Sequence, residues 1–357
     1  MPAFLKINCY VRKDNHMARN VYGLDLGSYE IKVYDKKQDI IWREKTALSI
    51  KDGKEIIAVG NESYEMFGKV PSNIDVVFPM KEGVISRFND MQHLLQNLLK
   101  RKEHRFALDS EYVIAVPTDV TEVEKKAFFD LVIHSTARAK EVNIVERGIA
   151  DAVGLNLDVW NTNGLFIVNF GAETTELSVL AGGGIVFNRR LKIGGTSFDQ
   201  SIVQLIKYNH DFLIGRHTAE NLRKRAGIFN DDNNIVLPVA GRNLITGVPQ
   251  QHGISINLVR AALKDPLEEC VKAIESMLLR TPPEVRRAIY KNGIFLTGGV
   301  ANLQGLEVYI EEMTGIPART ALNPEICAVT GLKDIMMSKD LRKLAFSMLN
   351  EGYRWMK

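Results

Sequence analysis

The stretch 164–180, GLFIVNFGAETTELSVL, decides how the rest of the chain is read. An apolar run, 165–168, ends at Asn169, and a second apolar run begins at Leu177. Two such runs on either side of a glycine turn predict a β-hairpin. The turn at Gly171 lets backbone N–H groups approach an anion, and the hydroxyls that follow it suit a phosphate with its metal ion. The pattern is common, however, and most hairpins of this composition bind nothing.

Two other parts of the chain combine an apolar run with a glycine turn. Residues 21–28, VYGLDLGS, add an acidic residue and a hydroxyl, and the strand-like segment 31–34 follows them. Residues 293–300, GIFLTGGV, precede a helix-like segment. Three strand–glycine elements in this order resemble the superfamily of actin, heat-shock chaperones and sugar kinases. In that superfamily the first two loops hold the nucleotide phosphates from opposite domains, and the third lies beneath the adenosine.

Within this superfamily the chain is similar to the bacterial actins, the MreB or rod-shape-determining family. The resemblance covers roughly residues 22–337 and implies an α/β, actin-like ATPase fold, with two related α/β domains around a nucleotide cleft and a small inserted subdomain in each. Further motifs carry it, in this order: Val59-Gly60, Pro79 to Ile85, Val116-Pro117-Thr118, Gly194-Gly195 with Asp199, Leu213-Ile214-Gly215, Thr281-Pro282-Pro283-Glu284 and Thr314-Gly315-Ile316-Pro317.

The same comparison divides the chain into parts. A last helix, from Cys327 to Met337, is expected to cross back from the second domain to the first. The expected divisions are an N-terminal extension (1–20), domain I (21–159, with an insert at about 36–85), domain II (160–337, with an insert at about 205–255) and a C-terminal tail (338–357).

Local patterns predict individual elements. Leucines at helical spacing between Asn89 and Lys102 predict an amphipathic helix with one core face. Thr121 and Glu124 have the spacing of a capping box, which starts a helix running towards Ala137. Alternating apolar residues at positions 5–11 have the period of a strand rather than a helix, and a poorly ordered tail is the favoured alternative for this extension.

Composition limits the class of protein. The chain has 357 residues, of which 45% are hydrophobic and 25% charged, the ordinary values of a globular protein with ample core. A net charge of +3 on 46 basic and 43 acidic residues is too balanced to indicate nucleic acid as a partner. Cys9, Cys270 and Cys327 lack ligand spacing and suit a reducing compartment. No apolar run is long enough for a transmembrane helix or a secretory signal, so we expect a cytosolic protein.

The resemblance implies ATP and Mg²⁺ in the cleft, but two positions depart from the family. The metal should lie between two acids: Asp25 is in place, whereas Asn169 stands at the second position and serves only through a water molecule. Arg147 occupies the place of the acid that orients the attacking water, and a guanidinium cannot accept a proton. Thr174, also associated with that water, is retained. We therefore expect weak or absent ATPase activity.

The resemblance also assigns the nucleotide-binding residues. The second loop has Ala172 and Glu173 where the family has glycines, and one hypothesis pairs Glu173 with Arg147. For Arg223 and Lys224 a solvated helix face is the alternative. The expected residues are Asp25, Gly27, Ser28, Tyr29 and Glu30; Gly171, Ala172, Glu173, Thr174 and Thr175; Glu220, Arg223 and Lys224; and Gly298, Gly299, Val300, Ala301 and Asn302.

In function, the resemblance implies an actin-like cytoskeletal protein that forms nucleotide-dependent filaments under the membrane, in rod-shape determination and cell-wall morphogenesis. Its partners would be further copies of itself, other bacterial actins, the inner surface of the cytoplasmic membrane and the cell-wall elongation machinery. Members of the family contact the membrane through an N-terminal amphipathic helix, which the pattern at positions 5–11 fits poorly, or through a hydrophobic loop. Here only Phe106, Ala107 and Leu108 could serve in that loop, and a solvated loop is the alternative. The alternative is a divergent, hydrolysis-poor paralogue that acts as a regulatory or capping subunit of another bacterial actin filament.

Overall fold

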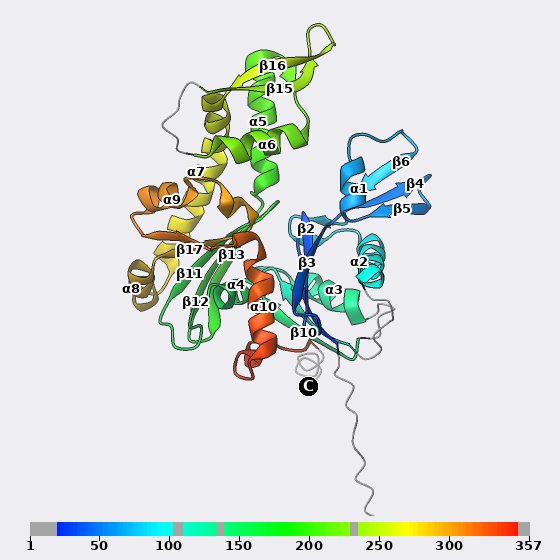
Figure 1. The fold of residues 1–357 in the computed structure, drawn as a ribbon. Coiled ribbons are helices and arrows are strands. Elements are labelled where there is room, and N and C mark those ends of the chain that lie inside the picture. Colours follow the sequence, from blue (N-terminus) through cyan, green and yellow to red (C-terminus); the bar gives the residue numbers. More distant parts are fainter. Residues whose placement is uncertain (1–19, 103–109, 134–138, 229–234, 349–357) are drawn as a thin grey trace, which may run out of the picture.

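The computed structural model describes residues 20–102, 110–133, 139–228 and 235–348. The strand-like pattern at positions 5–11 and the loop at 106–108 lie outside these residues. Figure 1 shows two α/β domains side by side, each carrying a smaller subdomain at the same end of the molecule. The two domains with an inserted subdomain in each are the architecture that the resemblance implied, but the inserts, which it placed at opposite tips, lie at the same end. Within the described residues, every helix is too short or too polar to cross a membrane.

Domain I is built on a five-stranded sheet in the order β10-β9-β1-β2-β3. The central strand β1 pairs in parallel with β9 and antiparallel with β2. Both β1 and β9 are almost continuously apolar, as expected of strands that are covered on both faces. Helices α2 and α3 pack on one face, and α4 and α10 on the other. The bounds are β1 (Val21–Leu26), β2 (Glu30–Asp35), β3 (Ile40–Lys45), β9 (Glu111–Val116), β10 (Glu141–Glu146), α2 (Phe88–Lys102), α3 (Glu122–Ile133), α4 (Arg147–Gly154) and α10 (Cys327–Met337).

Two local expectations for domain I are confirmed. The amphipathic helix is α2, and the leucines at its helical spacing are buried. The capping box also forms: the Thr121 N–H donates to Glu124 Oε2 at 2.8 Å, and the Glu124 N–H donates to Thr121 Oγ1 at 3.2 Å.

The insert of domain I is shorter than the expected range 36–85. Strand β3 belongs to the main sheet, because it pairs with β2 along its length and buries Trp42 opposite Val33. The separate small sheet, β5-β4-β6, begins only at Leu48. Its elements are β4 (Leu48–Lys51), β5 (Glu55–Val59), β6 (Ile74–Val77) and α1 (Asn61–Met66), followed by the hairpin β7 (Met80–Lys81) and β8 (Val84–Ile85).

Domain II repeats the plan with a sheet in the order β13-β12-β11-β17-β18. The hairpin predicted from 164–180 is confirmed as β11 and β12, which pair antiparallel from Leu165↔Leu180 to Phe170↔Thr175. The bounds are β11 (Leu165–Phe170), β12 (Thr175–Ala181), β13 (Gly184–Leu191), β17 (Ile294–Thr297), β18 (Ala318–Thr320), α5 (Gly195–His210), α7 (Ile256–Arg280), α8 (Pro283–Asn292), α9 (Leu306–Thr314), η1 (Gly299–Asn302) and η2 (Pro324–Ile326).

The insert of domain II is a three-stranded sheet, β14-β15-β16, with one helix. It starts a few residues later than the expected position 205, because α5 continues to His210. Its elements are β14 (Phe212–Leu213), α6 (Arg216–Ala226), β15 (Val236–Asn243) and β16 (Pro249–Ser255).

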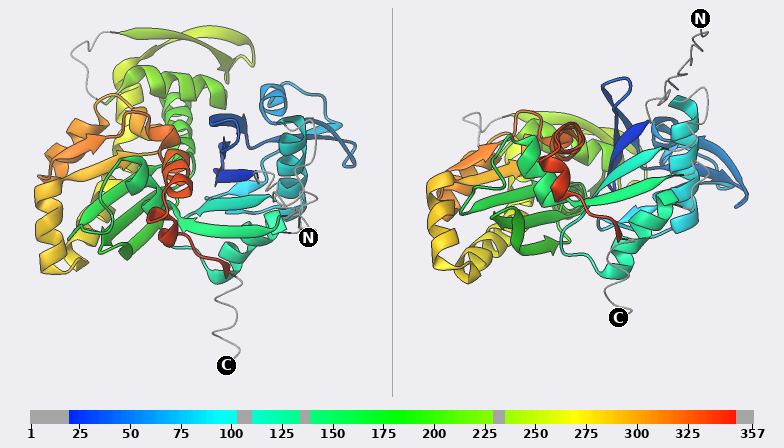
Figure 2. Two further views of the ribbon diagram at one scale, coloured as in Figure 1. Left: turned by 60° about the horizontal axis from the view of Figure 1, so that its bottom comes forward. Right: turned by 90° about the horizontal axis from the view of Figure 1, so that it is seen from below.

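Helix α10 joins the two domains, as expected. It lies between them in the views of Figures 1 and 2, and it packs on α4 and β1. The helix crossing brings backbones into contact: a Cβ added at Gly331 would lie 1.8 Å from the Ala150 carbonyl oxygen. One core cluster accordingly contains Val21 of domain I, Ile167 of domain II and Leu332 of α10.

The described part of the C-terminal segment packs against domain I and is not a free tail. After η3 (Leu341–Leu344), Phe346 forms an antiparallel bridge with Ile144 of β10. The two residues exchange backbone hydrogen bonds of 2.8 and 3.0 Å. Phe346 therefore adds a single bridge to the β10 edge of the domain I sheet.

Candidate functional site

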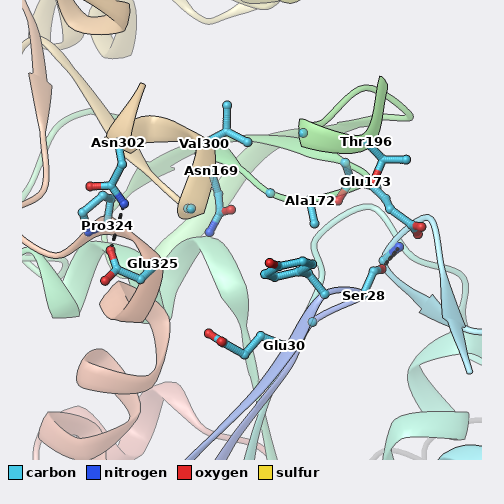
Figure 3. Close-up of a pocket in the computed structure, with 18 of the residues that line it drawn as sticks. Ser28, Glu30, Asn169, Ala172, Glu173, Thr196, Val300, Asn302, Pro324 and Glu325 are labelled. Atoms are coloured by element: carbon cyan, nitrogen blue, oxygen red, sulfur yellow. Dashed lines mark hydrogen bonds between the residues drawn. The ribbon is translucent and has the colours of Figure 1, made fainter. Parts of the chain in front are cut away.

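A cavity of about 360 Å³ lies between the two domains. Three glycine turns converge on it, from β1–β2, from β11–β12 and from β17–η1. Figure 3 shows Ser28 and Glu30 on one wall and Asn169, Ala172 and Val300 on the other. Of the expected residues, those that line the cavity are Asp25, Gly27, Ser28, Tyr29, Glu30, Arg147, Asn169, Gly171, Ala172, Glu173, Thr174, Glu220, Arg223, Lys224, Gly298, Gly299, Val300 and Asn302.

Two expected residues do not face the cavity. Thr175 is buried in β12, and its hydroxyl donates to the Ile193 carbonyl at 2.8 Å. Ala301 is buried in η1, where its N–H donates to the Gly298 carbonyl. Both support the turns that line the site, and neither presents a polar side-chain atom to it.

The third glycine turn needs glycine at Gly298. Its φ is +83°, and a Cβ there would lie 2.4 Å from the Phe170 carbonyl oxygen and 2.5 Å from Asn169 Oδ1. The turn therefore rests directly against the end of β11. This close approach brings the second and third glycine turns together beside the cavity.

Arg147 lies at the first position of α4, beneath the cavity, and is 7% exposed. Its guanidinium forms a short ion pair with Glu176 of β12, lies 3.4 Å from Asp25 Oδ1 of β1, and donates to the Leu26 carbonyl at 3.2 Å. Burial lowers the pKa of Arg147, but the Glu176 and Asp25 carboxylates raise it by more, so the group stays charged. Glu176 Oε2 also accepts from the Thr118 N–H of domain I.

The hypothesis that Glu173 pairs with Arg147 is wrong. Glu173 lies in the turn, and its Oε2 accepts a hydrogen bond of 2.6 Å from the N–H of Glu82 in the β7–β8 hairpin of domain I. The Glu82 carboxylate in turn pairs with Lys192 of domain II at 2.5 Å. Glu173 therefore links the two walls of the cavity at its rim, while the strand residue Glu176 reaches the guanidinium.

Lys32 is a cavity residue that sequence reasoning missed. It stands directly opposite Asp25 in the β1–β2 pairing, and its Nζ lies 3.0 Å from Asp25 Oδ2. Burial raises the pKa of Asp25, but Lys32 and then Arg147 attract the carboxylate more strongly and lower the pKa. The available signal was the position of Lys32 in the strand-like segment 31–34. Residues that stand opposite each other on paired strands have their side chains on the same face of the sheet, so Lys32 faces Asp25.

Asp151 is a second residue that sequence reasoning missed. It is fully buried one helical turn after Arg147, and its Oδ2 accepts from Asn169 Nδ2 at 2.7 Å. Its Oδ1 has no hydrogen-bond partner among the described residues. Burial raises the pKa of Asp151 to about 7, although the bond from Asn169 opposes this, and the nearby Asp25 raises it further. The i,i+4 spacing from Arg147 was the available signal.

This pKa leads to a prediction on stability and pH. Because folding raises the pKa of Asp151 above its ordinary value of 3.8, the folded state binds an extra proton between about pH 4 and 7. The stability of the wild type should fall as the pH rises through this range, by up to about 4 kcal/mol from this group. Asp151→Asn should remove that part of the dependence. Urea unfolding of both proteins at pH 5.5 and 7.5 tests this, and equal changes in the two proteins would contradict it.

On the side expected to hold adenosine, α6 provides three residues with different surroundings. Glu220 accepts hydrogen bonds from Tyr29 of domain I at 3.1 Å and from Lys224 at 2.7 Å. Arg223 is buried and pairs with Asp199 at 2.7 Å, so the solvated-face alternative does not hold for it. The solvated-face alternative does hold for Lys224, whose side chain is 59% exposed. At the far end Asn302 donates to Glu325 (Figure 3).

The chain is similar to known proteins along most of its length. The family described as MreB/Mbl protein matches residues 19–344. The cell shape-determining protein MreB of Escherichia coli (strain K12) is 34% identical over 329 residues, which are 90% of this chain and 94% of that protein.

Two solved structures are also similar. The structure of MreB 5 of Spiroplasma citri bound to AMPPNP has a TM-score of 0.86 at 28% identity and covers 91% of this chain and 98% of that one. The MamK double helical filament has a TM-score of 0.77 at 20% identity, with 90% of this chain and 99% of that one covered, and shows likeness of fold alone.

Proposed function

The chain belongs to the MreB/Mbl family, and on that premise we propose that it binds an adenine nucleotide between its domains and assembles into nucleotide-dependent filaments. It is a bacterial actin, a cytoskeletal protein of the class that determines cell shape. The observation that carries the proposal is the convergence of three glycine turns on one cavity lined from both domains. The relative from Spiroplasma citri was solved with AMPPNP.

The shape of the molecule supports the proposed assembly. Both small subdomains lie at one end (Figure 1). A contact between this end of one copy and the opposite end of the next is heterologous and does not close, which gives an open filament. A nucleotide held by both domains would bias their relative position and thereby the contact. We further propose that the filament lies at the inner face of the cytoplasmic membrane and works with the cell-wall elongation machinery.

A second candidate function rests on Arg147. A buried guanidinium in the place of the water-orienting acid favours a paralogue that binds nucleotide but hydrolyses it poorly, and that regulates or caps filaments of another bacterial actin. Mixed assembly with such an actin, without assembly alone, would favour this role.

We expect Gly299→Phe to abolish nucleotide binding while leaving the fold intact. A Cβ at Gly299 meets only the Glu325 Cβ, at 3.9 Å, so the ring would extend into the cavity. The wild type should gain about 2.7 kcal/mol of stability at a nucleotide concentration 100 times Kd. The variant should gain none. Thermal unfolding with and without ATP measures this difference.

The matched control is Gly184→Phe, because Gly184 also has open space around its Cβ position but lies outside the cavity lining. It should keep the ATP-dependent shift. Sedimentation and electron microscopy of the same three proteins then test assembly, which should require ATP in the wild type and fail in Gly299→Phe. A wild type without any ATP-dependent shift would contradict nucleotide binding.

A further inference from the structure

The floor of the cavity carries four ionic side chains whose charges balance. Asp25, Lys32, Arg147 and Glu176 all line the cavity, and their side chains are between 4% and 13% exposed. Two are positive and two are negative. The carboxylates therefore have cationic partners from the chain itself.

These contacts do not fit a resident divalent cation. Both oxygens of Asp25 face cations, with Oδ2 at 3.0 Å from Lys32 and Oδ1 at 3.4 Å from Arg147. A metal ion bound through Asp25 would lie close to both positive groups and would be repelled by them. Asn169, at the second metal position, is an amide whose nitrogen is bonded to Asp151, so it adds no charge. The expectation of Mg²⁺ in this site is therefore not supported by the donor set.

Lys32 has donors to spare, whereas Arg147 does not. Arg147 Nε is buried against Asp25 Oδ1 at 3.4 Å, and the rest of its guanidinium contacts Glu176 and the Leu26 carbonyl. Lys32 donates to Asp25, and an ammonium group has two further hydrogens. A hydrogen bond from this ammonium group to a phosphate oxygen is among the stronger ones in proteins.

We infer that this site binds a nucleoside di- or triphosphate without a divalent cation, because Lys32 and Arg147 already occupy the carboxylate at which a metal ion would bind, and Lys32 can donate to a phosphate oxygen in its place. The inference rests on the proposed nucleotide binding and adds which group takes the place of the metal ion beside the phosphates. It also explains why the acid expected at position 169 is dispensable: without a metal ion to hold, an amide is sufficient there.

The test is a fluorescence titration of the full-length protein with N-methylanthraniloyl-ADP, once in excess EDTA and once in excess MgCl₂. We expect the two Kd values to differ by less than about 3-fold. Binding that requires Mg²⁺, with a Kd more than about 10-fold weaker in EDTA, would overturn the inference and leave nucleotide binding standing. Failure to bind under both conditions would instead contradict the proposed function.

Lys32→Gln provides a second, independent test, because it removes one of the two cations from a partly accessible position. Binding in EDTA should weaken by about 10-fold or more. Mg²⁺ should restore part of the loss, since the remaining carboxylate is then free to hold a metal ion. Lys207→Gln on the exposed face of α5 is the matched control and should bind like the wild type. Unchanged binding of Lys32→Gln in EDTA would also overturn the inference.

Discussion

Arg147→Ala is expected to destabilise the protein by about 3–5 kcal/mol, because it leaves two buried carboxylates without their shared partner. Glu176 and Asp25 lie on strands of different domains, and Arg147 joins them beneath the cavity. Lys32 still compensates Asp25 in the variant, whereas Glu176 keeps, among the described residues, only the side-chain hydrogen bond from the N–H of Thr118. The lost stability should therefore come mainly from a weaker contact between the two domains.

Urea unfolding measures this loss, with Arg101→Ala as the matched control. Arg101 pairs with Glu62 at 3.1 Å, but both side chains are largely exposed. Surface pairs of this kind contribute about 0–1 kcal/mol. The double variant Arg147→Ala/Glu176→Gln should be less destabilised than the sum of its single changes, because it leaves one buried charge fewer. A loss for Arg147→Ala no larger than that for Arg101→Ala would show that the buried pairs do not stabilise the fold.

The second large effect concerns ATP hydrolysis, which should be very slow in the wild type. Nothing at position 147 can accept a proton from water, and general-base assistance is typically worth about 10²–10⁴-fold. The side-chain amide of Asn169 donates a hydrogen bond to the Asp151 carboxylate. The exchange Asn169→Asp/Asp151→Asn keeps that pair and returns the acid to the end of β11. Adding Arg147→Glu should then raise phosphate release by about 10²–10⁴-fold in the presence of Mg²⁺.

The double exchange without Arg147→Glu is the control for this experiment. It retains the guanidinium and should release phosphate as slowly as the wild type. Circular dichroism at the assay temperature checks that the triple variant is folded. Equal rates in the double and triple variants would mean that another group orients the water, with Thr174, which lines the cavity, the first to be examined.

Local patterns in the sequence predicted much of the architecture. The hairpin of β11 and β12, the amphipathic α2 and the capping box of α3 were all predicted correctly. Each depends on periodicity or capping within a few residues, so neighbouring side chains contain the necessary information. The last helix, Cys327–Met337, was placed by the family resemblance and has the expected bounds.

Features that depend on distant partners were missed or misplaced. The edge strand β3 was assigned to an insert, because a strand's sheet is defined by the strand it pairs with. The docked C-terminal segment was taken for a tail for the same reason, since its partner Ile144 lies about two hundred residues earlier. Neither feature has a signal in its own composition.

The sequence by itself determined the strand–turn elements, the family and the unusual residues at positions 147 and 169. Only the tertiary structure decided what those residues do. Sequence reasoning paired Arg147 with Glu173, whereas the true partner is Glu176. The physical reason is direction: Glu173 lies in a turn and points to the rim, where Glu82 holds it, while Glu176 lies in a strand whose pairing with β11 points its side chain beneath the cavity. The charge balance at this site depends on which side chains of the two domains lie close together. That proximity arises only when the chain folds, and the order of residues does not reveal it.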